Sequence, residues 1–109
     1  LLLTTRARRS GKARTTPLTY FQSGSELVVV ASNGGADRAP DWSLNLQQQP
    51  AAHVQIGAER LAVRGREASA EERERLWPTI IGTYAGYARY ERRTTRRIPL
   101  FILTPSRDS

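Results

Sequence analysis

Glu26-Leu27-Val28-Val29-Val30-Ala31-Ser32 is the most apolar and most β-branched run in this chain of 109 residues. β-branched residues favour strands, and no polar residue interrupts positions 27–31, so we predict a strand buried on both faces. The preceding residues 22–25, Gln-Ser-Gly-Ser, predict a turn. Residues 15–21 before that turn predict a partner strand, in which Pro17 is tolerated at a sheet edge. The fold is therefore predicted to start from this hairpin.

Other segments on both sides of the hairpin show strand patterns. They are residues 1–3, 52–56, 59–67 and 98–104. Most of them are joined by short turns containing Gly, which is typical of antiparallel hairpins. About six short strands in so small a domain tend to close on themselves. We therefore predict a mainly β, α+β fold, a small barrel of mostly antiparallel strands with short helices packed outside.

Two helices are expected among these strands. The first covers residues 42–49, with Asp41 as its N-cap and Pro50 after its end. The second starts from a capping box made by Ser69 and Glu72. We predict that Pro78 kinks this second helix or begins another one. The charged residues 71–75 mix signs, which indicates a solvated face.

Composition limits the classes of function. The chain carries 17 Lys and Arg against 10 Asp and Glu, a net charge of +7, which favours anionic partners. It contains no Cys, which excludes disulfides and thiolate chemistry and fits a reducing cytoplasm. No apolar run approaches the roughly 20 residues that span a bilayer. We expect one domain over residues 1–109. Because the sequence has no Met and opens on an apolar run, we expect it to start inside a longer protein.

The segment between the first two predicted strands is strongly basic. Arg6, Arg8, Arg9 and Lys12 surround a Ser-Gly pair at positions 10 and 11. Backbone N–H groups, a hydroxyl and Arg side chains together suit a phosphate or a carboxylate cluster. The alternative is a solvated basic hairpin. The loop 33–40, which contains Gly34 and Gly35 and leads into a helix, is a second candidate anion site.

The chain offers few groups for protein-based catalysis. His53 is its one histidine and has no evident partners, and no phosphate-binding loop, dinucleotide fingerprint, nucleophile elbow or zinc spacing occurs. An enzyme with this sequence would thus depend on an organic cofactor. Tyr84, Tyr87 and Tyr90, spaced by three, either pack at the core edge or wall a flat aromatic ligand.

Several segments together resemble the deazaflavin-dependent nitroreductases and quinone reductases. The matching segments are 32–36, Pro40, Trp42, 44–46 and Pro50; 8–11, Arg14 and Pro17; 71–73 and 76–78; Tyr84, Tyr87, Tyr90, Thr95 and 97–99. The resemblance covers nearly the whole chain. It implies a split β-barrel of the flavin-reductase type, with reduced deazaflavin coenzyme F-420 as hydride donor to a quinone or nitroaromatic acceptor.

The resemblance also implies site residues, matched one at a time. Cofactor contacts are expected from Arg8, Arg9 and Ser10 to the phosphate and acidic tail; from Arg14, Thr15, Thr16, Pro17, Leu18 and Thr19 under the ring; from Val30, Ala31, Ser32 and Asn33 beside it; and from Asp41, Trp42, Ser43, Leu44 and Asn45 near the phosphate. Tyr87 matches an active-site Tyr in contact with the cofactor. We expect Tyr87 and Ser32 to be catalytic, by orienting the acceptor or donating hydrogen bonds. No metal site is expected.

The family is best known from actinobacteria, often at the cytoplasmic face of the membrane, so a cytoplasmic protein with possible membrane contact through a preceding segment is implied. The oligomeric state is left open. Ala7, Ala13, Thr19 and Ser43 depart from common family residues, which should reshape acceptor preference. The alternatives are a reductase of the same barrel type that binds flavin mononucleotide, and a basic nucleic-acid-binding barrel. A nucleic acid partner is not expected from the resemblance.

Overall fold

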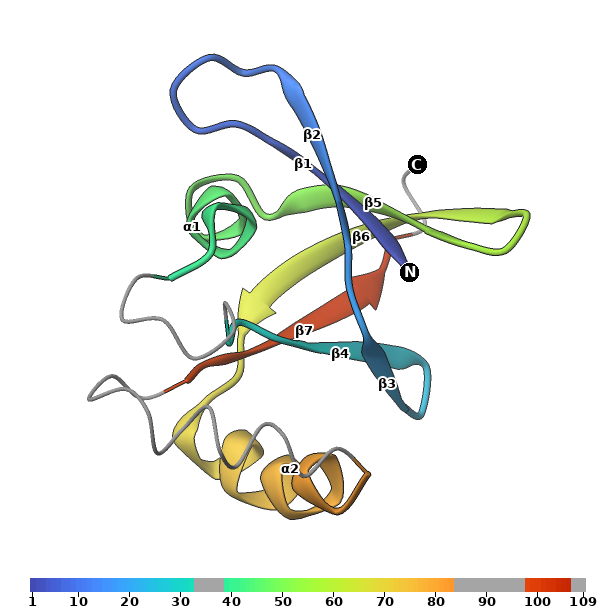
Figure 1. Ribbon diagram of the computed structural model, residues 1–109, viewed down its shortest axis with the longest axis vertical. Helices are drawn as coiled ribbons and strands as arrows, with labels where there is room; N and C mark the ends of the chain where they lie inside the picture. Colours follow the sequence, from blue (N-terminus) through green and yellow to red (C-terminus); the bar gives the residue numbers. More distant parts are fainter. Residues whose placement is uncertain (33–38, 84–97, 107–109) are drawn as a thin grey trace.

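The computed structural model describes residues 1–32, 39–83 and 98–106, which form seven strands and two helices (Figure 1). In chain order these are β1 (Leu2–Arg6), β2 (Ala13–Pro17), β3 (Tyr20–Ser23), β4 (Glu26–Val30), α1 (Asp41–Gln48), β5 (Ala51–Ile56), β6 (Glu59–Glu67), α2 (Ala70–Thr83) and β7 (Leu100–Pro105). The strands form one sheet in the order β2-β1-β5-β6-β7-β4-β3, and every neighbouring pair is antiparallel. The predicted mainly β, antiparallel fold is confirmed.

Strand β4 is buried on both faces, as predicted. The exposed fraction of every residue from 27 to 31 is 7% or less. Val29 lies opposite Phe101 of β7, and both belong to a cluster on the inner face of the sheet. Val28 lies opposite Ile102, and both belong to a second cluster on the outer face. Two cores therefore share this strand pair.

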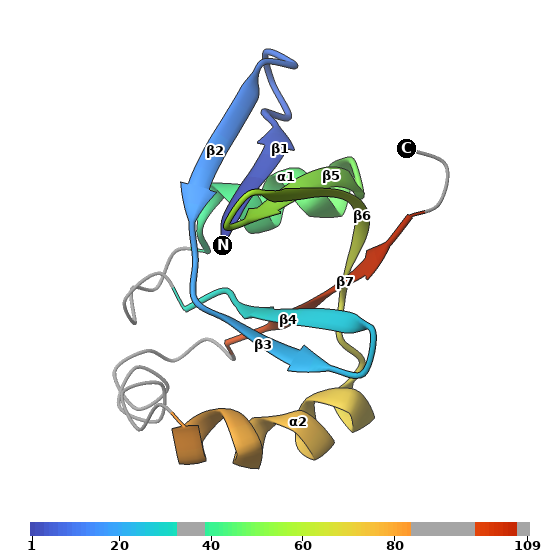
Figure 2. The same ribbon diagram turned by 90° about the vertical axis from the view of Figure 1, so that its right-hand side faces the viewer.

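The predicted single strand over residues 15–21 is wrong, because it is two strands at opposite edges of the sheet. β2 pairs with β1, and β3 pairs with β4. Pro17 has no N–H to continue a ladder. The next residue, Leu18, exchanges two hydrogen bonds of 2.8 Å with Leu1 before the chain crosses to β3. The sheet thus curls into a split barrel whose two edges are consecutive in sequence (Figure 2).

The helices cover different parts of this barrel. α1 contributes Trp42 and Leu46 to the inner cluster, among residues of β1, β4, β5, β6 and β7. α2 packs Ile80 against the outer cluster, beside β3 and β4 (Figure 2). Gly65 of β6 allows α1 to approach closely, since a Cβ there would lie 3.0 Å from two carbons of Leu46. Neither helix is long and apolar enough to cross a membrane.

Helix α1 begins one residue earlier than predicted. Asp41 is its first residue, Pro40 occupies the N-cap position, and no side chain caps the helix there. The prediction of Asp41 as N-cap is therefore wrong. The Ser43 hydroxyl donates to the Pro40 carbonyl at 2.7 Å, which ties the first turn to the preceding residue.

Helix α2 runs through Pro78, so of the two predicted alternatives the start of another helix is wrong, and a kink at Pro78 stays a prediction. Pro78 and Glu74, whose carbonyl loses its donor, both lie on the exposed face, where water can serve that carbonyl. Arg73 is buried rather than solvated: its Nε donates to the Ile98 carbonyl at 2.9 Å, and its guanidinium lies 4.6 Å from the Trp77 ring centroid. Mixed charge alone does not reveal such a hydrogen bond to a carbonyl 25 residues away, in the segment just before β7.

The predicted capping box of α2 is confirmed. The Ser69 N–H donates to Glu72 Oε1 at 2.9 Å, and the Glu72 N–H donates to Ser69 Oγ at 3.2 Å. Arg66 of β6 also donates to both oxygens of this carboxylate, at 2.7 and 2.9 Å. The hydrogen bonds from Arg66 and then from the Ser69 backbone lower the pKa of Glu72 from 4.5 to about 2. The box is thereby joined to the sheet.

We predict that Glu72→Gln lowers stability at neutral pH by about 1 kcal/mol, since a capping interaction is lost. The ionised carboxylate stabilises the fold fully above pH 4.5, and this stabilisation is lost as pH falls toward 2, because the unfolded chain takes up the proton first. Urea unfolding between pH 7 and 2.5 should therefore show a weaker acid dependence for the variant. Glu71→Gln, an exposed change in the same turn, is the control. Equal pH dependence of wild type and Glu72→Gln would contradict this role.

Candidate functional site

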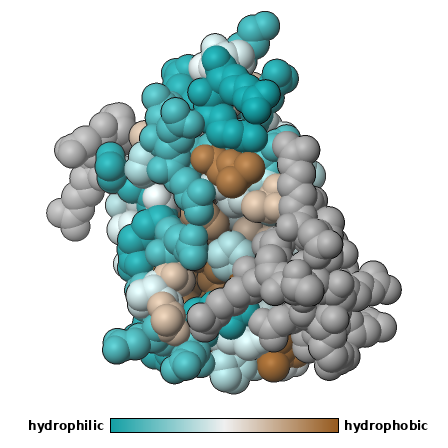
Figure 3. Space-filling model, turned by 90° about the vertical axis from the view of Figure 1, so that its left-hand side faces the viewer, coloured by the Kyte–Doolittle hydropathy of each residue, from teal (hydrophilic) through white to brown (hydrophobic). Residues whose placement is uncertain are grey.

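A groove of about 740 Å³ lies between the β1–β2 hairpin and α1. It is lined by Thr5, Ala7, Arg8, Arg9, Ser10, Ala13, Arg14, Thr15, Thr16, Asp41, Trp42 and Asn45. Three arginines therefore face one aspartate, so the groove favours an anion. Figure 3 shows this side of the molecule, where hydrophilic residues at the top lie above apolar surface. A ligand with a charged part and a flat apolar part suits such a surface.

The basic turn has a defined backbone conformation. The Ala7 N–H donates to the Lys12 carbonyl, and the Gly11 N–H donates to the Ala7 carbonyl, both at 2.8 Å. Gly11 has a φ of 73°, which favours glycine. The Lys12 N–H donates to Ser10 Oγ at 3.3 Å, so this hydroxyl helps to shape the turn. The turn between β1 and β2 therefore has a defined backbone, and this backbone sets the positions of its Arg and Lys residues.

Asn45 of α1 connects the turn to the barrel. Its Oδ1 accepts hydrogen bonds from the Arg8 backbone N–H at 3.1 Å and from the Arg8 guanidinium at 2.9 Å. Its Nδ2 donates to Thr5 Oγ1 at 3.3 Å. The Arg8 guanidinium also lies 3.4 Å from Asp41 Oδ1. The helix start and the turn therefore form one hydrogen-bonded unit.

Trp42 gives the groove a rigid apolar wall. It is 5% exposed and packs edge-on against Phe101, with ring centroids 5.5 Å apart and an interplanar angle of 72°. Trp42 therefore belongs to the inner core, although the same residue also lines the groove.

The structure brings together nine of the predicted cofactor-contacting residues in this groove. They are Arg8, Arg9, Ser10, Arg14, Thr15, Thr16, Asp41, Trp42 and Asn45. These residues come from a β-hairpin and a helix that are distant in sequence, so the grouping is a property of the fold. Their contact with a ligand stays a prediction.

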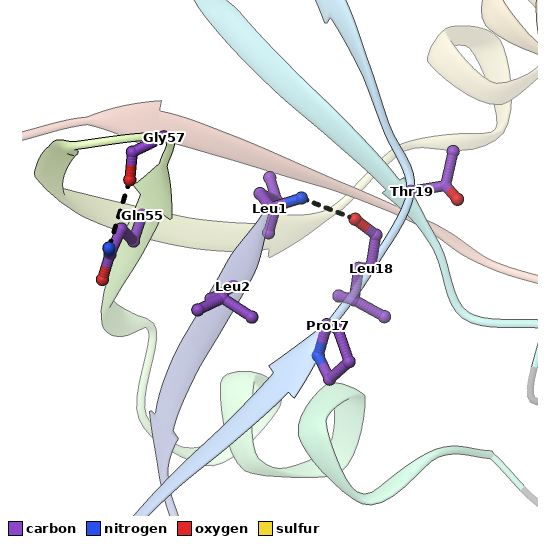
Figure 4. A pocket seen from close by; sticks show the side chains of 7 residues that line it. All are labelled: Leu1, Leu2, Pro17, Leu18, Thr19, Gln55 and Gly57. Atoms are coloured by element: carbon purple, nitrogen blue, oxygen red, sulfur yellow. Dashed lines mark hydrogen bonds between the residues drawn. The ribbon is translucent and has the colours of Figure 1, made fainter.

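Three more of the predicted residues, Pro17, Leu18 and Thr19, line a different and more apolar pocket of about 460 Å³ with Leu1 and Leu2 (Figure 4). They lie where the chain crosses from β2 to β3. The segment predicted to lie under the cofactor ring thus lines two separate pockets. Residues 14–16 line the basic groove, and residues 17–19 line the apolar pocket.

The remaining predicted residues are buried, half-buried or not described. Val30, Ala31 and Ser32 are buried at the end of β4, and Ser43 is buried in α1. Leu44 is half-buried. Asn33 and Tyr87, together with Tyr84 and Tyr90, lie outside the described residues. His53 is exposed on β5, and the described part of the chain contains no cluster of His, Cys, Asp and Glu that could hold a metal ion.

Thr5, Ala7 and Ala13 line the groove but were not among the predicted contacts. Thr5 is 2% exposed and follows buried Leu3 by two positions, so strand alternation places both on the inner face. A polar residue at an inward position is the signal that could have identified Thr5. The Ala residues carry no chemical signal of their own.

Comparison with known proteins gives a consistent result. A family model described as F420H(2)-dependent quinone reductase matches residues 1–105. A Mycobacterium tuberculosis protein named "Putative F420H(2)-dependent quinone reductase" is 43% identical over 105 residues, which cover 96% of this chain and 88% of the relative. An F420H(2)-dependent quinone reductase of the same species is 36% identical, over 95% of this chain and 72% of its own. The solved structure of an F420-H2 dependent reductase aligns with a TM-score of 0.84 and 38% identity, over 94% of this chain and 90% of that one.

We predict that Gly11→Ala lowers the free energy of unfolding by about 1 kcal/mol, because a side chain disfavours the left-handed conformation. Gly82→Ala, an exposed change inside α2 with no atom within 4 Å of the new Cβ, should raise it by about 0.5–1 kcal/mol. Urea unfolding of the two variants measures both effects. A stabilising effect of Gly11→Ala would mean that the turn does not adopt this conformation in solution.

Proposed function

Since the chain belongs to the F420H(2)-dependent quinone reductase family, we propose that the groove under the β1–β2 turn binds reduced coenzyme F-420 and that the protein uses it to reduce a quinone. Membership of this family makes the protein an oxidoreductase, and the family description names the reductant. The observation that carries the binding site is the convergence of Arg8, Arg9 and Arg14 on a groove with one aromatic wall, Trp42.

The residues of the groove fit this cofactor. A phosphate and an acidic tail need cations and N–H donors, which Arg9 and Arg14 supply on exposed positions and Arg8 on a half-buried one. Trp42 lines the groove and is 5% exposed, so it offers the ring only the small part of its surface that the core leaves open. Thr15 and Thr16 add hydroxyls along β2. When bound, the reduced deazaflavin supplies a hydride.

The chain's own contribution is binding, orientation and hydrogen bonding. We assign Arg8, Arg9 and Arg14 to binding the anionic part of the cofactor. We assign to Trp42 the role of limiting the access of water to the groove. We assign Tyr87 and Ser32 to the acceptor, where a hydroxyl can donate a hydrogen bond to the quinone oxygen as negative charge develops on it. A proton then comes from this hydroxyl or from solvent.

Two finer predictions rest on the resemblance alone. Reduction of nitroaromatic compounds is one of them. Thr19 and Ser43, which differ from the common family residues, should influence whether such acceptors are used. Location at the inner face of the cell membrane is the other. Neither is needed for the proposed reduction of a quinone.

We predict that Arg14→Ala weakens binding of coenzyme F-420 about tenfold or more, because a charge-assisted hydrogen bond is lost. Fluorescence titration of the purified protein at two salt concentrations measures this, with flavin mononucleotide titrated in parallel. Arg75→Ala removes the same charge from an exposed position on α2 and should leave affinity unchanged. Binding of flavin mononucleotide alone, or binding of neither molecule, would contradict the proposal.

We predict that Tyr87→Phe lowers kcat for quinone reduction about 100-fold, the usual cost of removing one oxyanion donor. Because the ring is retained, affinity for coenzyme F-420 should change little. Stopped-flow oxidation of the reduced cofactor by a soluble quinone separates the two effects. Tyr20→Phe, at a half-buried position beside the inner core, is the control. Unchanged turnover in Tyr87→Phe would remove this residue from the mechanism.

A further inference from the structure

Asn45 is a buried amide at the junction of three elements. Its exposed fraction is 3%, and it belongs to α1. It contacts Arg8 in the turn and Thr5 on β1, residues 37 and 40 positions away in sequence. Buried amides of this kind must be satisfied, and both ends of this one are. Asn45 is therefore held in one orientation by the barrel.

One oxygen of Asn45 holds Arg8 in two ways. The hydrogen bond to the Arg8 backbone N–H, 3.1 Å, fixes the position of the turn. The hydrogen bond to the Arg8 guanidinium, 2.9 Å, fixes the direction of the side chain. A long side chain that is already held loses less conformational entropy when a ligand binds. The Arg8 cation is thereby placed at the groove before the ligand arrives.

Asp41 also contacts the Arg8 guanidinium, but more weakly than Asn45 does. The Arg8–Asp41 separation is 3.4 Å, against 2.9 Å for Asn45, and the Asp41 side chain is 68% exposed. Exposed ion pairs of this kind contribute little, because water and salt screen them. An anion in the groove can therefore replace Asp41 at Arg8 far more readily than it can replace Asn45.

We infer that Asn45 is a positioning residue, which presents Arg8 to the anionic part of the cofactor, and that Asp41 is a resident counter-ion which this anion displaces. This inference rests on the proposed function, and it assigns opposite effects to two neighbours of one arginine. Asn45 raises affinity by acting through Arg8. Asp41 lowers affinity, because its negative charge repels the anionic ligand and pairs with Arg8 when no ligand is bound.

A double-mutant cycle on coenzyme F-420 binding tests the role of Asn45. Arg8→Ala and Asn45→Ala should each weaken binding about tenfold, and the loss in the double variant should be clearly smaller than the sum of the two single losses in free energy. Affinity for a deazaflavin that lacks the phosphate and acidic tail should be the same in all four proteins. Equal losses for both ligands, or additive losses in the double variant, would show a merely structural role and overturn the inference.

Asp41→Asn supplies the second arm of the test. It should tighten binding of the intact cofactor severalfold at low salt, with a smaller effect at high salt. It should leave binding of the tail-free deazaflavin unchanged. Weaker binding of the intact cofactor by Asp41→Asn would overturn the assignment of Asp41 as a displaced counter-ion.

Thr5→Val keeps the test decisive if Asn45→Ala does not fold. Valine retains the β-branched shape on β1 and removes the hydroxyl that accepts from Asn45 Nδ2. Binding of the intact cofactor should weaken severalfold, and that of the tail-free deazaflavin should not. An unchanged affinity would overturn the role of Asn45. Failure of the wild type to bind coenzyme F-420 would instead contradict the proposed function, so the two failures are distinguishable.

Discussion

The structure depends on the need to cover both faces of β4. Val28 and Val29 are adjacent and point to opposite sides of the sheet, so neither side can be left in water without losing about 2 kcal/mol per side chain. The inner side is covered by the curled sheet and by α1. The outer side is covered by α2. The two-layer arrangement of this small chain follows from that single requirement.

Curling the sheet has a direct effect on the site. Once β2 and β3 lie at opposite edges, the β1–β2 hairpin extends beyond the barrel next to α1, as Figure 1 shows. The groove lies between them because helix and hairpin are both anchored to the inner core, the helix through Trp42 and the hairpin through Leu3. A binding site with charge on one side and aromatic surface on the other thus results from how the barrel is closed.

Local patterns in the sequence predicted most elements but not their long-range partners. The β-branched run 27–31 and the Ser69–Glu72 box were predictable, since each depends on residues close in sequence. The division of residues 15–21 depends on pairing with β1 and β4, which no local pattern reveals. In the same way, residue types indicated a basic anion site around Arg8, but its anchoring by Asn45 required the fold. The resemblance to a family, rather than periodicity, indicated which residues would meet in the groove.

The place of β7 has a consequence for how the chain is made. It is the last of the described strands, yet it lies between β6 and β4 in the sheet. The β3–β4 hairpin therefore has an unpaired, strongly apolar edge while the ribosome synthesises everything from α1 to α2. Such edges are where nascent chains associate wrongly. The sheet of this barrel is thus completed only after residues 100–105 leave the ribosome, because β6 and β4 are joined through β7.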